Sequence, residues 1–415
     1  MIWLVSVNFR SYWKVIPMID NEKTRKTPVL RFKGFTDDWE QRKFSEIAQR
    51  ESAAKKSSTD FPSVEYEDVV SEVGILNKDV RLKETQKTGI GFDGSQVLYG
   101  KLRPYLHNWL SPDFSGVAVG DWWVLKPVNV DKSFLFRLIQ TEKFDDIANQ
   151  SSGSKMPRAD WNLLSNTEFM VPAEIEEERK IGQYFSELDH LITLHQKKVF
   201  SLTIVKKSML EKMFPKAGSK VPEIRFYGFT GDWEQRKLGE ITEISSGQNV
   251  PNEDGGKYYN LTMGSVNTEG HLVCSLHTNR SDRLLVKGTL IMPTRDVGAG
   301  YVIGRTAVID ENDKYYAGNC LYCLSTGLNE PYYIHHYMNS EMARKSMQII
   351  VAGGSQKQIT LPGIKSIEVP ICSIEEQRKI AQLFNDLDKT ITLHQKELDK
   401  LLALKKSMLS EMFPK

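Results

Sequence analysis

Four short segments of the chain combine basic or amide side chains with glycines. Residues 94–106 (GSQVLYGKLRPYL) and 287–298 (KGTLIMPTRDVG) each read as a strand that runs into a basic turn. Residues 150–161 (QSSGSKMPRADW) and 352–363 (AGGSQKQITLPG) each read as a small glycine-containing loop. The candidate contact residues in these segments are Lys101, Arg103, Lys155, Arg158, Arg295, Ser355, Gln356, Lys357 and Gln358.

These side-chain types are the ones that recognise DNA. Arginine pairs bidentately with O6 and N7 of guanine, glutamine pairs with N6 and N7 of adenine, and serine hydroxyls or backbone N–H groups hold phosphates. Glycine lets the backbone approach a phosphate closely. Solvated surface turns are the alternative interpretation for each residue taken singly. Arg103 and Arg295 are the strongest candidates, because both stand in equivalent basic turns after strands.

Motifs for other chemistry are missing from the sequence. Cys320 and Cys323 form a C-x-x-C pair with no second pair or histidine cluster, which favours structural thiols over a metal or redox site. No Walker loop, helicase carboxylate motif, methyltransferase Asn/Asp-Pro-Pro-aromatic motif or nuclease Asp…Glu-x-Lys cluster stands out. We therefore expect no catalytic and no metal-binding residues, and a chain that is not an enzyme on its own.

An internal duplication supplies the elements that must position these loops. Residues 28–47 (PVLRFKGFTDDWEQRKFSEI) return as residues 222–241, and residues 175–198 (IEEERKIGQYFSELDHLITLHQKK) return as residues 374–397. The regions between these repeats hardly resemble each other. A repeated frame with two variable inserts suits a molecule with pseudo-twofold symmetry that reads two different things with two equivalent domains.

The second repeated segment has the heptad pattern of a coiled coil. Each copy predicts a helix of about 35 to 40 residues, or roughly 55 Å, whose apolar seam needs a partner. The two helices most simply pack antiparallel as a spacer, with His195/His394 and Lys206/Lys405 as polar residues that fix the register. The predicted seam comprises Ile181, Phe185, Leu188, Ile192, His195, Leu202, Ile380, Phe384, Leu387, Ile391, His394 and Leu401.

Each variable region reads as mixed strand and loop, with one shorter helix over residues 133–148 and another over 332–347. The predicted fold class is α+β, with two globular mixed α/β domains in pseudo-twofold arrangement, joined by two long antiparallel coiled-coil helices. The predicted boundaries are an N-terminal extension over 1–27, a first domain over 28–172, a first helix over 173–216, a second domain over 217–370 and a second helix over 371–415. We expect Met18 to be the natural start, because the repeat begins only near Pro28.

Composition limits the class of protein and its cellular location. The formal net charge of +2 excludes a polybasic wrapper of nucleic acid, so any DNA contact must come from local patches. No apolar run reaches the roughly 18 residues of a membrane span, and no signal peptide is evident. Four cysteines fit a reducing cytosol, and the expected location is cytoplasmic.

The layout resembles the specificity subunit of a type I restriction-modification enzyme. The residues that carry the resemblance are the FxGFTxDWEQRK openings at Phe32 and Phe226, the YGKLRP turn at Tyr99, and the EE-x-RKI-x-Q-x-F-x-x-LD helix starts at Glu176 and Glu375. The resemblance covers nearly everything after about residue 28. The order of variable domain, helix, variable domain and helix is the order of that family.

The resemblance implies that the variable regions are target-recognition domains, each reading one half of an asymmetric bipartite DNA sequence, while the helix pair sets the gap. It implies binding to double-stranded DNA and to two methylation subunits, which use S-adenosylmethionine to modify adenine. It also implies restriction subunits that use ATP and Mg to cut DNA. This chain itself is expected to bind no cofactor and no membrane.

Three other readings remain open at this stage. A stand-alone nuclease or methyltransferase would need a catalytic cluster, and labelled S-adenosylmethionine or plasmid would reveal its activity. A purely structural coiled-coil adaptor would need no basic loops, and random-sequence libraries would show no enrichment in gel shifts. A non-catalytic DNA-binding protein outside any restriction system is the remaining alternative.

Overall fold

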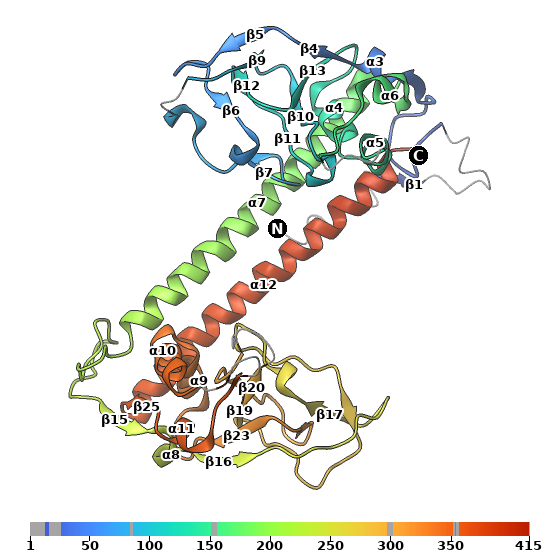
Figure 1. Cartoon of the computed structure of the whole chain (residues 1–415). Helices are drawn as coiled ribbons and strands as arrows, with labels where there is room; N and C mark the ends of the chain where they lie inside the picture. The colour runs from blue at the N-terminus through green and yellow to red at the C-terminus, as the bar shows by residue number, and fades with distance from the viewer. Residues whose placement is uncertain are drawn as a thin grey trace. The chain divides into compact units, whose positions relative to one another are not determined.

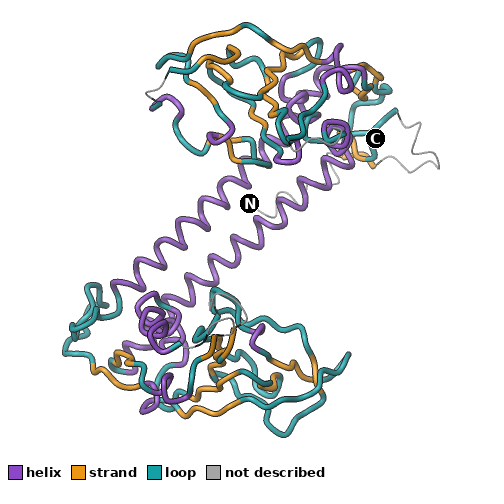
Figure 2. The backbone as a smooth tube through the Cα atoms, viewed as in Figure 1, coloured by secondary structure: helices purple, strands orange, loops and turns teal. Residues whose placement is uncertain are grey.

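The structure, a computed structural model, describes residues 13–15, 26–83, 86–150, 156–296, 302–351, 353 and 357–414. The chain divides into two compact units. Unit 1 comprises residues 1–196 and 396–415, and unit 2 comprises residues 197–395. Each unit therefore combines a globular region with parts of both long helices (Figures 1 and 2). No helix of the described residues is long and apolar enough to cross a membrane.

Two four-stranded sheets form the globular region of unit 1, in the orders β11-β10-β13-β4 and β5-β9-β12-β6. Both faces of the first sheet are buried, because alternate residues of its central strands join two different hydrophobic clusters. The elements are β4 (Ala48–Glu51), β5 (Ala54–Lys56), β6 (Ser63–Val64), η2 (Tyr66–Asp68), β7 (Val69–Val70), β8 (Ile75–Leu76), η3 (Val80–Leu82), β9 (Thr88–Phe92), β10 (Val97–Gly100), η4 (Pro104–Leu106), β11 (Trp109–Leu110), β12 (Gly116–Ala118), β13 (Trp122–Pro127), α4 (Lys132–Leu138), α5 (Glu142–Ala148) and α6 (Trp161–Asn166).

Unit 2 has sheets in the orders β16-β23-β19-β21 and β18-β17-β22. Its central strands are again apolar on both faces and contribute to two clusters. The elements are β16 (Glu243–Ser246), β17 (Tyr258–Leu261), η5 (Met263–Ser265), β18 (His277–Thr278), β19 (Leu290–Pro293), β20 (Arg295–Asp296), β21 (Ala307–Val308), β22 (Tyr315–Ala317), β23 (Leu321–Ser325), α9 (Pro331–Asn339), α10 (Glu341–Ile350), β24 (Lys357–Gln358) and α11 (Leu361–Lys365).

The two globular regions share a topology although their sequences differ. Each region contains a parallel strand pair, β6 with β12 in unit 1 and β17 with β22 in unit 2. In both, the second strand of the pair comes directly before a central strand of the other sheet, β13 or β23. Strands β6 and β17 each lead into a 3₁₀ turn whose third residue, Asp68 or Ser265, accepts a hydrogen bond from the backbone three residues earlier. The variable regions are therefore two versions of one architecture.

The repeated openings close each domain onto its helix. Strand β3 (Glu40–Lys43) pairs antiparallel with β14 (Glu168–Val171), and β15 (Glu234–Lys237) pairs with β25 (Glu368–Ile371). A short helix follows each opening strand, α3 (Phe44–Ile47) and α8 (Leu238–Ile241), and the strand β1 (Trp13–Val15) pairs with β2 (Leu30–Phe32). The frame brings the start and end of each variable region together.

An ion pair, buried in unit 1 and partly buried in unit 2, ties each opening to the first turn of the following helix. Arg31 Nε and Nη2 donate to the two carboxylate oxygens of Glu177 at 2.6 and 2.7 Å, and Arg225 donates in the same way to Glu376 at 2.7 and 2.8 Å. The pairs belong to the two copies of the repeat. The arginine of each repeated opening binds the glutamate of the repeated helix start. This contact is a physical reason why both residues recur in the second copy.

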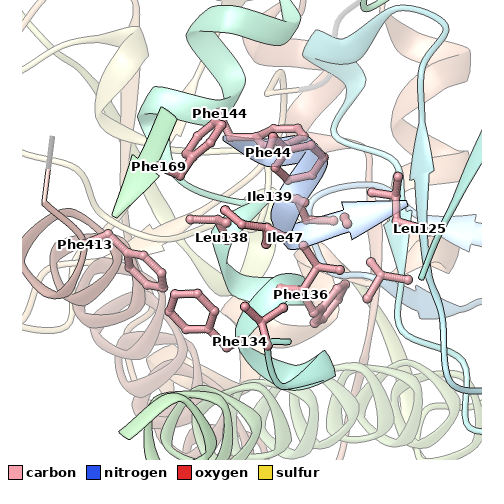
Figure 3. Close-up of a cluster of buried hydrophobic side chains, with 14 of the residues drawn as sticks. Phe44, Ile47, Leu125, Phe134, Phe136, Leu138, Ile139, Phe144, Phe169 and Phe413 are labelled. Atoms are coloured by element: carbon pink, nitrogen blue, oxygen red, sulfur yellow. The ribbon is translucent and has the colours of Figure 1, made fainter. Parts of the chain in front are cut away.

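The long helices are α7 (Ile175–Lys212) and α12 (Ile374–Met412). The C-terminal end of α12 belongs to unit 1, where Phe413 stacks on Phe134 with ring centroids 5.5 Å apart (Figure 3). The end of α7 belongs to unit 2, where Phe214 packs 5.3 Å from Tyr333. Each globular core is therefore completed by a phenylalanine that follows the end of a long helix.

The single short helix expected over 133–148 is wrong, because the structure has two helices there, α4 and α5. Thr141 ends the first and caps the second: its hydroxyl donates to the carbonyl of Leu138 and accepts from the backbone of Phe144. The helix expected over 332–347 is likewise two helices, α9 and α10, with Ser340 in extended conformation between them as the cap of α10. A capping hydroxyl within an apolar pattern marks each break.

Candidate nucleic-acid interface

In unit 1 the predicted basic turn and the predicted loop lie side by side. Leu102 and Arg158 form an antiparallel bridge. The backbone N–H of Ala159 donates to the carbonyl of Lys101 at 2.8 Å, and that of Arg103 donates to the carbonyl of Pro157 at 2.7 Å. The structure thereby brings Lys101, Arg103 and Arg158 together, whereas Lys155 lies outside the described residues.

Unit 2 repeats this arrangement with a short ladder. Strand β20 pairs with β24, so that Arg295 faces Gln358, and the backbone N–H of Ile359 donates to the carbonyl of Thr294 at 3.0 Å. Arg295 and Gln358 are exposed, and Lys357 is partly buried. Ser355 and Gln356 lie outside the described residues.

The hydrogen-bond register corrects the expected equivalence of Arg103 and Arg295. The carbonyl groups of Lys101 and Thr294 accept the same ladder bond, so Arg295 corresponds to Leu102, one residue earlier than Arg103. The same register aligns Gln358 with Arg158. The two arginines look equivalent in the sequence because both follow a strand within a basic turn. Their alignment is set by the pairing of each turn with its loop, which the sequence does not show.

Asp121 holds the basic side chains of unit 1. Arg158 donates from Nε to Oδ1 at 3.2 Å and from Nη2 to Oδ2 at 3.1 Å, while Lys101 Nζ lies 3.6 Å from Oδ1. The hydrogen bond from Arg158 is the main cause that lowers the pKa of Asp121, and the charge of Lys101 adds to it. A fixed carboxylate therefore sits between the two cations and restricts where they point.

The backbone around Asp121 is fixed as well. Its carbonyl accepts from the N–H of Lys101 at 2.9 Å and from the hydroxyl of Tyr66 at 2.6 Å, and the same hydroxyl accepts from the N–H of Leu102 at 3.0 Å. Burial raises the pKa of Tyr66, so the hydroxyl remains a donor. Sequence reasoning missed Asp121 and Tyr66; the signal was an acidic residue after glycine between two apolar runs, in VAVGDWWVL.

Arg103 begins the tight turn η4 in the left-handed region, with φ 50°. His107 closes that turn at φ 51°, and its imidazole lies 3.0 Å from Asp145 and stacks on Trp109. The hydrogen bond with Asp145 is the main cause that raises the pKa of His107. Residues with side chains rarely adopt this conformation without support, and it concentrates at functional sites.

The cysteine pair stands at the corresponding place in unit 2. The carbonyl of Cys320 accepts from the N–H of Thr294 at 2.9 Å, as the carbonyl of Asp121 does from Lys101. Cys323 lies within β23, and burial raises the pKa of its thiol to about 12. Among the described residues, no group of three or more histidine, cysteine or acidic side chains could hold a metal ion.

The predicted seam residues are partly or wholly buried. Ile181, Phe185, Leu188 and Ile192 are buried in unit 1, and Ile380 and Phe384 are buried in unit 2. Six predicted seam residues are partly buried: His195, Leu202, Leu387, Ile391, His394 and Leu401.

An acidic residue on each helix meets the predicted polar seam lysine within its unit. Lys405 Nζ lies 2.8 Å from Asp189 in unit 1, and Lys206 Nζ lies 2.5 Å from Asp388 in unit 2. Asp189 also binds the buried Arg137 at 2.6 Å. Each lysine therefore has a specific partner, which is the behaviour expected of a residue that sets register.

This fold and these loops define a DNA specificity protein: two domains of one architecture, each presenting a different basic or amide-rich bridge, on a repeated helical frame. Residues 36–202 and 230–403 each match the model of the type I restriction modification DNA specificity domain. The chain belongs to this family, with two copies of its domain. The prediction of a specificity subunit is confirmed by this match.

Relatives support the same assignment along most of the chain. The type I restriction enzyme MjaVIII specificity subunit of Methanocaldococcus jannaschii is 23% identical over 359 residues, covering 81% of this chain and 80% of that protein. The putative MjaX specificity subunit of the same organism is 23% identical over 312 residues, covering 68% and 67%. The S subunit of a type I restriction-modification system from M. genitalium has a similar fold, with a TM-score of 0.59 at 14% identity, covering 94% of this chain and 99% of that one.

Proposed function

We propose that the chain reads an asymmetric bipartite DNA target, one half with each unit. The observation that carries this proposal is the pair of equivalent bridges with unlike side chains: Arg158 opposite Leu102 in unit 1, and Gln358 opposite Arg295 in unit 2. Equivalent positions on equivalent scaffolds can meet DNA in the same way. Different side chains at those positions then select different bases, which makes the two half-sites unlike.

The nine candidate residues named from the sequence remain the proposed DNA contacts. Lys101 and Arg103 flank the bridged Leu102, and Lys357 neighbours Gln358, so base-reading and phosphate-binding side chains lie within a few residues of each other. Phosphate contacts position a protein on the duplex and base contacts give sequence preference. Each bridge offers both kinds.

The long helices are the proposed spacer, packed as an antiparallel coiled coil. Lys405 in the second half of α12 meets Asp189 in the first half of α7, and Lys206 in the second half of α7 meets Asp388 in the first half of α12. The same arrangement in both units supports the proposal that the two helices run in opposite directions. A rigid spacer of this kind would fix the gap between half-sites.

The partners and cofactors follow the family. We propose that the chain assembles with two methylation subunits that bind S-adenosylmethionine, and with restriction subunits that use ATP and Mg. It serves these subunits as the DNA reader, without catalysis and without a cofactor of its own. The absence of a catalytic motif in the sequence supports this division of labour.

A domain exchange tests the proposal. Residues 245–365 are replaced by the matching region of a relative, and the modified adenines of the host genome are mapped for both chains. We expect one half of the mapped target to change and the other half to stay, because each unit carries its own bridge. A matched exchange of residues 50–170 should alter the opposite half, and an exchange that altered both halves would refute separate reading.

A further inference from the structure

A carboxylate that binds one edge of an arginine can orient the guanidinium toward a base. In unit 1 Asp121 accepts from Nε and Nη2 of Arg158, which occupies one edge of the guanidinium. The guanidinium has five N–H donors in a planar fork, so a second edge, formed by Nη1 and Nη2, retains two donors pointing the same way. Two parallel donors match O6 and N7 of guanine.

We propose that Arg158 reads a guanine in the half-site of unit 1, and that Asp121 is the positioning residue that presents it. This rests on the proposed function and names one base of its target. Arg158 remains accessible, because 51% of its side chain is exposed. Among the described residues, none accepts a hydrogen bond from its Nη1, so the outer edge is available to DNA.

The surroundings of Asp121 favour a positioning role over an incidental surface ion pair. An exposed pair normally loses side-chain entropy to hold its geometry and gains little stability. Here the carbonyl of Asp121 is held by Lys101 and Tyr66, and the backbone of Arg158 is held by the bridge to Leu102. Both ends of the pair are therefore fixed before DNA arrives, which reduces the entropy lost on binding.

The corresponding position in unit 2 agrees with a base-reading role. Gln358 occupies the same register as Arg158, and an amide is the side chain that pairs with adenine. The residue of unit 2 that corresponds to Asp121 is Cys320. Unit 1 therefore has a carboxylate to orient its arginine, and unit 2, which has a glutamine instead, has none. A glutamine brings its own donor and acceptor and requires no carboxylate.

The test uses the full chain assembled with its methylation subunits and a duplex that carries the target mapped from the host genome. Binding of the cognate duplex is compared with that of single-base variants, including one with 7-deazaguanine, which lacks N7, at each guanine. Arg158→Ala should lower discrimination at one guanine of one half-site by roughly 5- to 150-fold and leave the other half unchanged. The wild-type complex should lose affinity for 7-deazaguanine at that position, and the Arg158→Ala complex should be indifferent to it.

Asp121→Asn separates aiming from simple charge. Removing a negative charge near DNA should raise affinity for every duplex, whereas loss of aiming should lower discrimination at the guanine read by Arg158. We expect both effects together. Uniformly tighter binding with unchanged discrimination would show that Asp121 acts by charge alone and would overturn the positioning role.

Arg280→Ala is the matched control, because Arg280 makes the same two-point contact with Asp282 on the surface of unit 2, at 2.9 and 3.1 Å. It should not alter the half-site of unit 1. If Arg158→Ala left discrimination unchanged at every base, or if the half-site of unit 1 contained no guanine, the inference would be overturned. The proposed function would still stand in that case, provided that the wild-type complex selects its target. A wild-type complex that bound all duplexes equally would refute the proposed function itself.

Discussion

Removing one partner of the ion pair between Arg31 and Glu177 should strongly destabilise unit 1. The side chains are only 3% and 1% exposed, and two charge-assisted hydrogen bonds join them. The equivalent Arg225 in unit 2 is 17% exposed and also donates to two backbone carbonyl groups. Loss of the carboxylate should therefore be more costly in unit 1 than loss of Glu376 in unit 2.

The expected magnitude follows from what each substitution leaves behind. Glu177→Met leaves a buried guanidinium without a counter-charge, a change that typically costs about 3 to 5 kcal/mol of unfolding free energy. Glu376→Met leaves an arginine that reaches water and keeps its carbonyl acceptors, so the loss should be about 1.5 to 3 kcal/mol. With a urea slope of about 2 to 3 kcal/mol per M, Glu177→Met should lower the midpoint for unit 1 by about 1 to 2.5 M.

Tryptophan fluorescence can follow unit 1, because Trp233 is the sole tryptophan in the sequence range of unit 2. Hydrogen exchange measured by mass spectrometry can follow peptides of unit 2. The double variant Arg31→Met with Glu177→Met should recover most of the loss, because replacing both charges by apolar groups is often neutral. Equal destabilisation by the single and double variants would refute the reasoning, as would a larger loss from Glu376→Met.

Three further outcomes are expected. Inserting one heptad into either long helix should lengthen the gap between half-sites by about three base pairs, because seven residues add about 10 Å, and genome mapping of modified adenines would detect it; an unchanged gap in both variants would exclude the spacer. Lys206→Met should destabilise unit 2 more than Lys405→Met destabilises unit 1, by about 1 to 2 kcal/mol in urea unfolding, because the latter leaves Arg137 beside the remaining carboxylate; equal losses would argue against this. Burial, with the nearby charge of Lys206, lowers the pKa of His336 to about 4, below about 6.5 in the unfolded chain, so about 3 kcal/mol of stability of unit 2 should be lost as pH falls from 6.5 to 4. His336→Gln should reduce that slope but not remove it, because burial also lowers the pKa of His335, whereas an unchanged slope would show that His336 is protonated in the folded state.

Much of the architecture was predictable because contacts within the frame leave paired traces in the sequence. Arg31 and Glu177 bind each other, and their copies Arg225 and Glu376 do the same, so both partners had to be retained in each repeat. The long helices were predictable from heptad spacing, because an apolar stripe that long needs a partner. Both the basic turns and the glycine-containing loops were found from their side chains in the sequence, but their contact with each other was not predicted and is a finding of the structure.

The details of the interface depend on tertiary contacts that leave no local pattern. Asp121 and Arg158 are 37 residues apart in sequence. The glycine before Asp121 marks a turn, but no neighbouring residue indicates that the carboxylate binds Arg158. The alignment of Arg295 with Leu102 rests on how each turn pairs with its loop, which sequence comparison of two dissimilar turns cannot detect. The helix break at Thr141 was hidden because apolar spacing continues through it, although the hydroxyl satisfies backbone groups on both sides.

The order of synthesis determines when each unit can complete its core. Unit 2 is one uninterrupted stretch, residues 197–395, whereas the core of unit 1 includes Met408, Met412 and Phe413 from the far end of the chain. A ribosome that adds roughly 5 to 20 residues per second leaves the domain made first waiting for roughly 10 to 40 s until those side chains emerge. During that interval its apolar surface near Phe134 is uncovered and open to chaperones. Unit 1 is begun first and finished last.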